Sequence, residues 1–314
     1  YDDQLLMFKL LVIAGLFYSL LMLFEVRMSP QLHTWLYDYF PHVFGQQRRF
    51  GGFRPVVFMG HGLLVSFFAV MVLISAVALW NNRIKIRTFS PAATSYYLLA
   101  VLVLCKSIAS LFYGVFVFFL LKMTKVKMQF RVAVLLATLA LLYPAMSIMN
   151  VFPHQTISNI ATSFDKERAQ SLTFRFDNEK VLLDHARDRF FFGSGGWGRN
   201  RVHNNETGKD ETVTDGRWII TFGTFGILGF IAEFGLLALS VFRAKQAAKF
   251  IKDKQQKTLL AAHALLVSII MVDQIPNASL APWLWLITGI LLGCSERIIA
   301  DSKVKTVAKM ESKV

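Results

Sequence analysis

The sequence predicts an all-α, polytopic membrane protein, and three observations support this fold class. Of its 314 residues, 54% are hydrophobic and only 17% are charged, against about 45–50% and about 25% in an ordinary soluble domain. Several apolar runs approach or exceed the roughly 20 residues that a helix needs to cross a bilayer. Segments that alternate apolar and polar residues, as half-buried strands do, are missing from the sequence.

The apolar runs extend along most of the chain. They are Leu5–Val26, Val56–Trp80, Tyr96–Leu121, Val132–Val151, Trp218–Phe242, Leu259–Val272 and Trp283–Cys294. Because the chain opens at Tyr1, directly before the first run, we expect further residues to precede it. Both cysteines, Cys105 and Cys294, lie inside apolar runs, which predicts small core residues and not a disulfide or a metal site.

Basic clusters between the runs predict the topology, because lysine and arginine mark cytoplasmic segments. Such clusters lie at 83–87, 122–131 and 243–257, and in a cytoplasmic basic tail at 301–314. The first two clusters flank a single run, Tyr96–Leu121, so that run must cross the membrane an even number of times. We therefore predict a broken or re-entrant hairpin at 94–122 with its break near Lys106, and about eight crossings in all. The alternative is one long tilted helix with Lys106 snorkelling.

Three connections then face away from the cytoplasm, at 27–55, 152–217 and 273–282. We expect membrane helices at 1–151, with the outer loop 27–55 among them, and again at 218–300. The segment 152–217 is polar, and a loop of that length usually has a function of its own. The net charge of +14 lies largely beside the apolar runs, so it reports topology, and we expect no nucleic acid as a partner.

Arginine is enriched in the outer segments, where topology signals do not require it. Arg48, Arg49 and Arg54 occur together in the string RRFGGFRP, and Arg175 and Arg217 belong to the long loop and its end. The planar guanidinium fork suits phosphate and carboxylate oxygens better than a lysine does. The pattern predicts a bound pyrophosphate or acidic glycan. The alternative is that the loop arginines pair with nearby carboxylates on a solvated helix surface.

Ionisable residues at the membrane surface and inside the runs supply candidates for catalysis. Asp215 lies just before the run that begins at Trp218, where it could act as a general base or cap the helix; His203 is a second candidate base. Lys106 and Glu233 lie inside runs, and a pair between them would line either an active site or a transport path. No spacing of His, Cys and Asp resembles a metal site.

One stretch of the chain resembles the O-antigen ligase and Wzy-type polysaccharide polymerase superfamily. The resemblance covers about 175–234 and includes Arg175, the segment Leu182–Asp188, the turn FFGSGGWG at 191–198, the string Asp215-Gly216-x-Trp218 and FGILGF at 225–230. It implies a GT-C-like membrane glycosyltransferase, inverting, metal-independent and without a cofactor. It also implies a place in the bacterial inner membrane, with 152–217 as a periplasmic catalytic loop.

The resemblance further implies roles for single residues. Arg175 matches the family's loop arginine, which binds the pyrophosphate leaving group. The family's histidine falls at Asp215 by its spacing from Gly226, so either Asp215 replaces that histidine or His203 is its displaced counterpart. Beside these catalytic candidates stand the residues expected to bind pyrophosphate, which are Arg48, Arg49, Arg54, Arg217 and Lys106.

The function implied is transfer of a glycan from undecaprenyl pyrophosphate to an acceptor hydroxyl. We expect a polysaccharide polymerase for O-antigen or exopolysaccharide, and keep the ligase that joins the finished polymer to a lipid or other acceptor as an alternative. The partners are then a polyprenyl pyrophosphate-linked donor, a glycan or lipid acceptor, and envelope polysaccharide assembly proteins. An anion transporter built around Lys106 and Glu233, or a scaffold of an export complex, is the alternative of another class.

Overall fold

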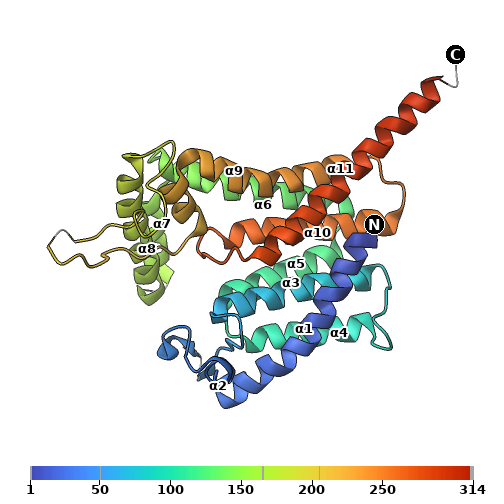
Figure 1. Ribbon diagram of the computed structural model, residues 1–314. Coiled ribbons are helices and arrows are strands. Elements are labelled where there is room, and N and C mark those ends of the chain that lie inside the picture. The colour runs from blue at the N-terminus through green and yellow to red at the C-terminus, as the bar shows by residue number, and fades with distance from the viewer. Residues whose placement is uncertain (1, 50, 165, 205, 312–314) are drawn as a thin grey trace. The chain divides into compact units, whose positions relative to one another are not determined.

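A computed structural model describes residues 2–49, 51–164, 166–204 and 206–311 (Figure 1). Among them, six helices are long and apolar enough to cross a membrane. They are α1 (Asp2–Met28), α3 (Gly62–Asn81), α6 (Val126–Ile148), α9 (Arg217–Ala247), α10 (Lys254–Asp273) and α11 (Pro282–Glu311), of which Pro282–Val304 is the apolar part. The predicted class is confirmed: the protein is an all-α, multi-pass membrane protein. The number of crossings and the GT-C-like fold stay predictions.

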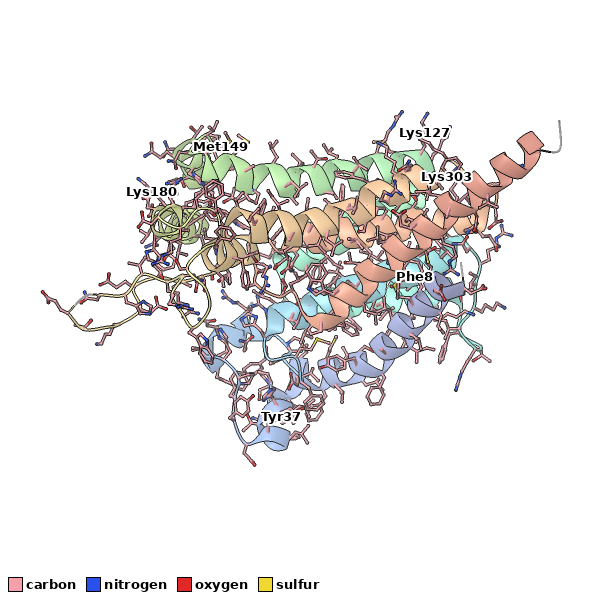
Figure 2. All side chains as sticks on the ribbon, turned by 45° about the horizontal axis from the view of Figure 1, so that its top comes forward. Phe8, Tyr37, Lys127, Met149, Lys180 and Lys303 are labelled. Atoms are coloured by element: carbon pink, nitrogen blue, oxygen red, sulfur yellow. The ribbon has the colours of Figure 1, made fainter. Side chains whose placement is uncertain are left out.

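The chain folds into two compact units. The first consists of 1–133, 243–266 and 289–314, and the second of 134–242 and 267–288. In the first unit, Tyr37 lies at the opposite end of α1 from Phe8, whereas Lys127 and Lys303 lie toward the Phe8 end (Figure 2). Lys127 and Lys303 thus lie toward the opposite end of this unit from Tyr37.

Helix α3 is the centre of the first unit. It is apolar on all sides and nearly all of it is buried, because α1, α4 (Pro91–Leu104) and α5 (Ile108–Met123) pack around it. Short elements join α1 to α3: α2 (Leu32–Tyr37), the 3-10 helix η1 (Phe44–Gln47), and the paired strands β1 (Arg48–Arg49) and β2 (Gly52–Phe53).

The predicted break near Lys106 is confirmed. Helix α4 ends at Leu104, α5 begins at Ile108, and Lys106 between them has a positive φ of 53°. The two helices run back along each other, since the rings of Tyr96 and Phe118 lie 5.9 Å apart, and Trp80 at the end of α3 contacts both rings. With 14 and 16 residues, α4 and α5 are about 21 and 24 Å long, shorter than a hydrocarbon core of about 30 Å.

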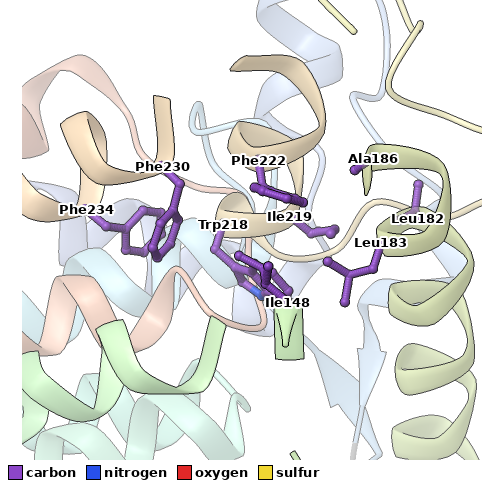
Figure 3. Close-up of a cluster of buried hydrophobic side chains, with 9 residues drawn as sticks. All are labelled: Ile148, Leu182, Leu183, Ala186, Trp218, Ile219, Phe222, Phe230 and Phe234. Atoms are coloured by element: carbon purple, nitrogen blue, oxygen red, sulfur yellow. The ribbon is translucent and has the colours of Figure 1, made fainter. Parts of the chain in front are cut away.

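In the second unit, the polar segment after α6 is largely helical. It contains α7 (His154–Phe164) and α8 (Lys166–Arg187), which pack on each other. A buried apolar cluster joins α8 to α6 and α9. Figure 3 shows Leu182 and Leu183 of α8 on one side of it and Phe230 and Phe234 of α9 on the other, with the fully buried Trp218 between them.

Helix α9 is interrupted at Gly226, which has φ 66° and ψ −165°. Arg217 nonetheless reaches Glu233 with two hydrogen bonds, from Nε to Oε1 at 2.6 Å and from Nη2 to Oε2 at 2.9 Å. A continuous helix would separate these two residues by about 24 Å. The chain therefore turns back at Gly226, and the apolar run Trp218–Phe242, expected to be one uninterrupted helix, is two helical pieces.

The loop after α8 fills the interruption in α9. The N–H groups of Ser194 and Gly195 donate to the carbonyls of Gly223 and Thr224, while the N–H of Ile227 donates to the carbonyl of Phe190. A Cβ on Gly193 would meet the backbone of Thr224–Gly226, and a Cβ on Gly226 would meet the backbone of Phe191 and Phe192. Glycine at both positions allows this close approach of two backbones. The Gly-rich turn thus satisfies the groups that a broken helix exposes.

Candidate functional site

Arg48 and Arg49, expected to bind pyrophosphate, lie side by side on strand β1. Their partners across the strand pair are Phe53 and Gly52, and both arginines are exposed. Arg49 donates from Nε to the Gln46 carbonyl at 3.3 Å. Both guanidinium groups are therefore solvated and accessible.

Arg54 and Lys106, also expected to bind pyrophosphate, come together although 51 residues separate them in the sequence. Arg54 is only 9% exposed and donates from Nη2 to the Lys106 carbonyl at 3.3 Å. The Lys106 ammonium lies where a side chain on Gly52 would begin. Burial, followed by the charge of Arg49, lowers the pKa of Arg54. A cationic cluster therefore forms at the Gly62 end of α3.

The sequence reading missed Glu25, which is fully buried near the end of α1. Its Oε2 accepts from the N–H groups of Val56 and Val57, each at 2.7 Å, and its Oε1 accepts from the N–H of Leu32 at 3.0 Å. Val57 has φ 47°, which a β-branched residue rarely adopts. One carboxylate thus fixes the loop that carries Arg54. The signal that the sequence offered for Glu25 was an acidic residue inside an apolar run.

Arg175 and Asp215, two of the catalytic candidates, form an ion pair in the second unit. Arg175 lies on α8 and Asp215 just before α9, and Nε and Oδ2 are 3.3 Å apart. The side chains are 42% and 39% exposed. The pair is open to a ligand, and the Asp215 carboxylate is placed by a guanidinium that can also contact phosphate.

Arg217, expected to bind pyrophosphate, is instead engaged by Glu233 through the two hydrogen bonds described above. Its backbone N–H donates to the carbonyls of Gln274 and Asn277. The guanidinium fork therefore ties together the two pieces of α9. Glu233, considered above as a partner of Lys106, has Arg217 as its partner.

His203 is the other candidate base. Among the described residues, no hydrogen bond or ion pair joins it to Arg175 or Asp215. Its backbone forms a bridge with Asp210, whose carboxylate also accepts from Arg201 at 2.8 Å. The His203 side chain lines an open hollow of about 530 Å³. The other residues lining it are His185, Arg189, Ser194, Trp197, Gly198, Arg199, Arg201 and Val202.

A second acid that the sequence reading missed is the half-buried Glu179 on α8. It accepts from the Tyr143 hydroxyl at 2.7 Å, and its other oxygen lies 3.3 Å from His154 Nε2. Burial raises the pKa of Glu179. Ser147 Oγ lies 3.5 Å from the same nitrogen, so this group is not a Ser-His-acid relay, which uses both ring nitrogens. His154 borders a cavity of about 370 Å³.

Within the described ranges, no three His, Cys, Asp or Glu side chains gather as they would around a metal ion. Comparison of the chain with family models, with curated proteins and with solved structures gives no match. The function therefore has to be argued from the geometry of these residues.

Proposed function

We propose that the protein is a membrane glycosyltransferase that moves a glycan from a polyprenyl pyrophosphate to an acceptor hydroxyl. The observation that carries the proposal is the accessible ion pair of Arg175 and Asp215. Two residues singled out for complementary chemical roles, from separate parts of the sequence, are neighbours in space. On this proposal, the protein lies in a bacterial inner membrane, with the pair on the periplasmic side.

The two side chains can divide the reaction between them. The acceptor oxygen attacks the anomeric carbon and gives its proton to Asp215, while the bond from that carbon to the diphosphate breaks and its electrons remain on the diphosphate. A guanidinium stabilises the charge that develops on the leaving group. Neither role requires a metal ion or a cofactor.

The ion pair also suggests how donor and acceptor steps are coupled. Arg175 contacts Asp215 through Nε, and a diphosphate would compete for the same guanidinium. Donor binding then frees the Asp215 carboxylate from Arg175, so that it can accept the proton of the acceptor hydroxyl. The base becomes active only when a donor is present. Asp215 is preferred to His203 because it is the candidate beside Arg175.

The second candidate function, an anion transporter, has one observation in its favour, the interrupted helix α9. Transporters use such interruptions to expose backbone groups to a solute. Here the loop residues 190–195 already bond to backbone groups at the break. This favours the transferase. Polymerase is preferred to ligase, and an export-complex scaffold is the outcome in which neither Arg175 nor Asp215 matters.

Glycan analysis of cells whose envelope polysaccharide depends on this protein tests the proposal. Arg175→Ala and Asp215→Asn are expected to reduce transfer by about 10²-fold or more, as loss of a general base or charge stabiliser does. A polymerase leaves single repeat units on the lipid, and a ligase leaves long polymer that is never joined to its acceptor. Arg201→Ala, which breaks another exposed ion pair of the same unit, is the matched control. Normal glycan in both test variants contradicts the proposal.

A further inference from the structure

Two neighbouring polar side chains in the first unit are buried and carry atoms that have no hydrogen-bond partner. Gln47, at the end of η1, is fully buried, and neither Oε1 nor Nε2 has a partner. Arg54 is 9% exposed, and its Nε likewise has none. Burying an amide unpaired costs about 1–3 kcal/mol, and a charged group costs more. These two buried side chains therefore do not stabilise the fold.

Both side chains lie against Gly62, the first residue of α3. A Cβ on Gly62 would lie 2.9 Å from Gln47 Oε1 and would overlap the methylenes of Arg54. The absence of a side chain at Gly62 thus leaves Gln47 and Arg54 against the start of a 20-residue helix. A helix N-terminus carries partial positive charge and attracts anions.

The charge of Arg54 is not balanced by a carboxylate partner among the described residues. Among the described residues, no ion pair joins Arg54 to an acid, and the neighbouring charge that acts most on it is Arg49. Glu25, the acid of this loop region, already accepts three backbone N–H groups. The Lys106 ammonium, against Gly52, adds further positive charge. An anion would relieve the repulsion in this cluster.

We propose that Gln47 and Arg54, beside the N-terminus of α3, bind one phosphate group. Phosphate oxygens accept from Arg54 Nε and from Gln47 Nε2. Gln47 Oε1 needs a donor, which the hydroxyl of a protonated phosphate, or a sugar hydroxyl beside the phosphate, provides and sulfate does not. The group belongs either to a lipid headgroup or to free phosphate. That it is part of the donor's diphosphate rests on the proposed function; phosphate binding itself does not.

Titration calorimetry on the full chain in detergent tests the site, with inorganic phosphate, farnesyl pyrophosphate and sulfate as probes. Gln47→Leu and Arg54→Met are expected to weaken phosphate-group binding by about tenfold or more. Gln46→Leu, an exposed amide one residue away, and Arg83→Met, an exposed arginine beyond the other end of α3, are expected to bind as the wild type does. Sulfate is expected to bind more weakly than phosphate.

Thermal unfolding without any anion separates loss of binding from loss of fold. Gln47→Leu removes an unpartnered buried amide, so its melting temperature is expected to equal or exceed that of the wild type. Equal phosphate affinity of Gln47→Leu and Gln46→Leu, or no binding of either phosphate probe to the wild type, overturns the proposal. Binding of farnesyl pyrophosphate alone identifies the lipid source, and binding of both probes includes free phosphate.

The variant Asp215→Asn keeps this experiment independent of the proposed reaction. It is expected to lose glycan transfer, while Gln47→Leu is expected to weaken phosphate binding in this variant as it does in the wild type. Transfer that survives in Asp215→Asn contradicts the reaction, while affinity lost in Gln47→Leu still supports the site. Transfer lost in Asp215→Asn together with unchanged affinity in Gln47→Leu contradicts the site alone.

Discussion

At the scale of single residues, Glu25 shows how one buried carboxylate can organise a loop. Its two oxygens accept three N–H groups from the segments that follow α1, and it is fully shielded from solvent. A residue that accepts several backbone hydrogen bonds cannot be shortened without leaving those donors unpaired. The position of Arg54, two residues before Val56, therefore depends on a side chain in α1.

We predict that Glu25→Ala destabilises the protein by about 3 kcal/mol or more, because three buried donors lose their acceptor. Thermal or denaturant unfolding in detergent measures the change. Asp3→Asn, which removes an exposed ion pair with Arg297, is the control and is expected to change stability by less than about 1 kcal/mol. Equal stability of Glu25→Ala and the wild type would show that water replaces the carboxylate.

The lowered pKa of His61 predicts that the stability of the protein depends on pH. Burial, followed by the charges of His42 and Arg54, lowers the pKa of His61 to about 4, and its Nδ1 accepts from the N–H of Leu63 as the cap of α3. The unfolded chain, with an ordinary value near 6.5, binds the proton more readily. The contribution of His61 to the free energy of unfolding is therefore fully present above about pH 6.5, and it is lost as the pH drops toward about 4.

The variant His61→Asn tests this origin of the pH dependence. Asparagine also caps helices but does not titrate in this range. Melting temperatures between pH 4 and 7.5 should fall less steeply with acidity in the variant than in the wild type. Parallel curves would assign the acid sensitivity to other groups.

The individual site residues differ in how far the sequence could identify them. Arg175 and Asp215 were selected from a motif, and they are neighbours in the structure. Gln47 has an ordinary neutral side chain beside a basic pair, so nothing in composition or spacing marks it. Its importance depends on being buried without partners, which only tertiary packing determines.

At the scale of elements, the two interrupted helical segments differ in their origin. The α4–α5 hairpin was predictable because two basic clusters restrict where the chain can lie, a constraint that a single sequence contains. The break in α9 was not, because its turn depends on Gly226 meeting Gly193 from an earlier segment. Contacts between distant segments leave no periodic signal in a sequence.

We predict that Gly226→Ala and Gly193→Ala disrupt the packing of the loop in the α9 break. Both glycines have a positive φ, which costs other residues about 1–3 kcal/mol, and a Cβ at either position would meet backbone atoms. Gly196→Ala, where a Cβ meets nothing within 4 Å, is the matched control. Melting temperature and protease sensitivity of the loop measure the effect. Unchanged behaviour of Gly226→Ala would mean that the two backbones can separate without cost.

At the scale of the whole molecule, the topology makes a prediction that does not depend on function. Single cysteines placed at Arg87 and Lys125, on either side of the α4–α5 hairpin, should react with an impermeant maleimide from the cytoplasmic face. Cysteines at Gly45 and Gly196, where a side chain meets no neighbour, should react from the opposite face. The native Cys105 and Cys294 are both buried and can be replaced first. Arg87 and Lys125 reacting from opposite faces would contradict the hairpin.

The loop that fills the break in α9 has a consequence for biosynthesis. The backbone partners of the break lie in residues 190–195, which leave the ribosome before α9 does. The first piece of α9 cannot settle stably in lipid until this earlier segment has returned to it. Insertion of α9 is therefore completed by tertiary assembly, and a chain that lacks residues 190–195 should be degraded by quality-control proteases.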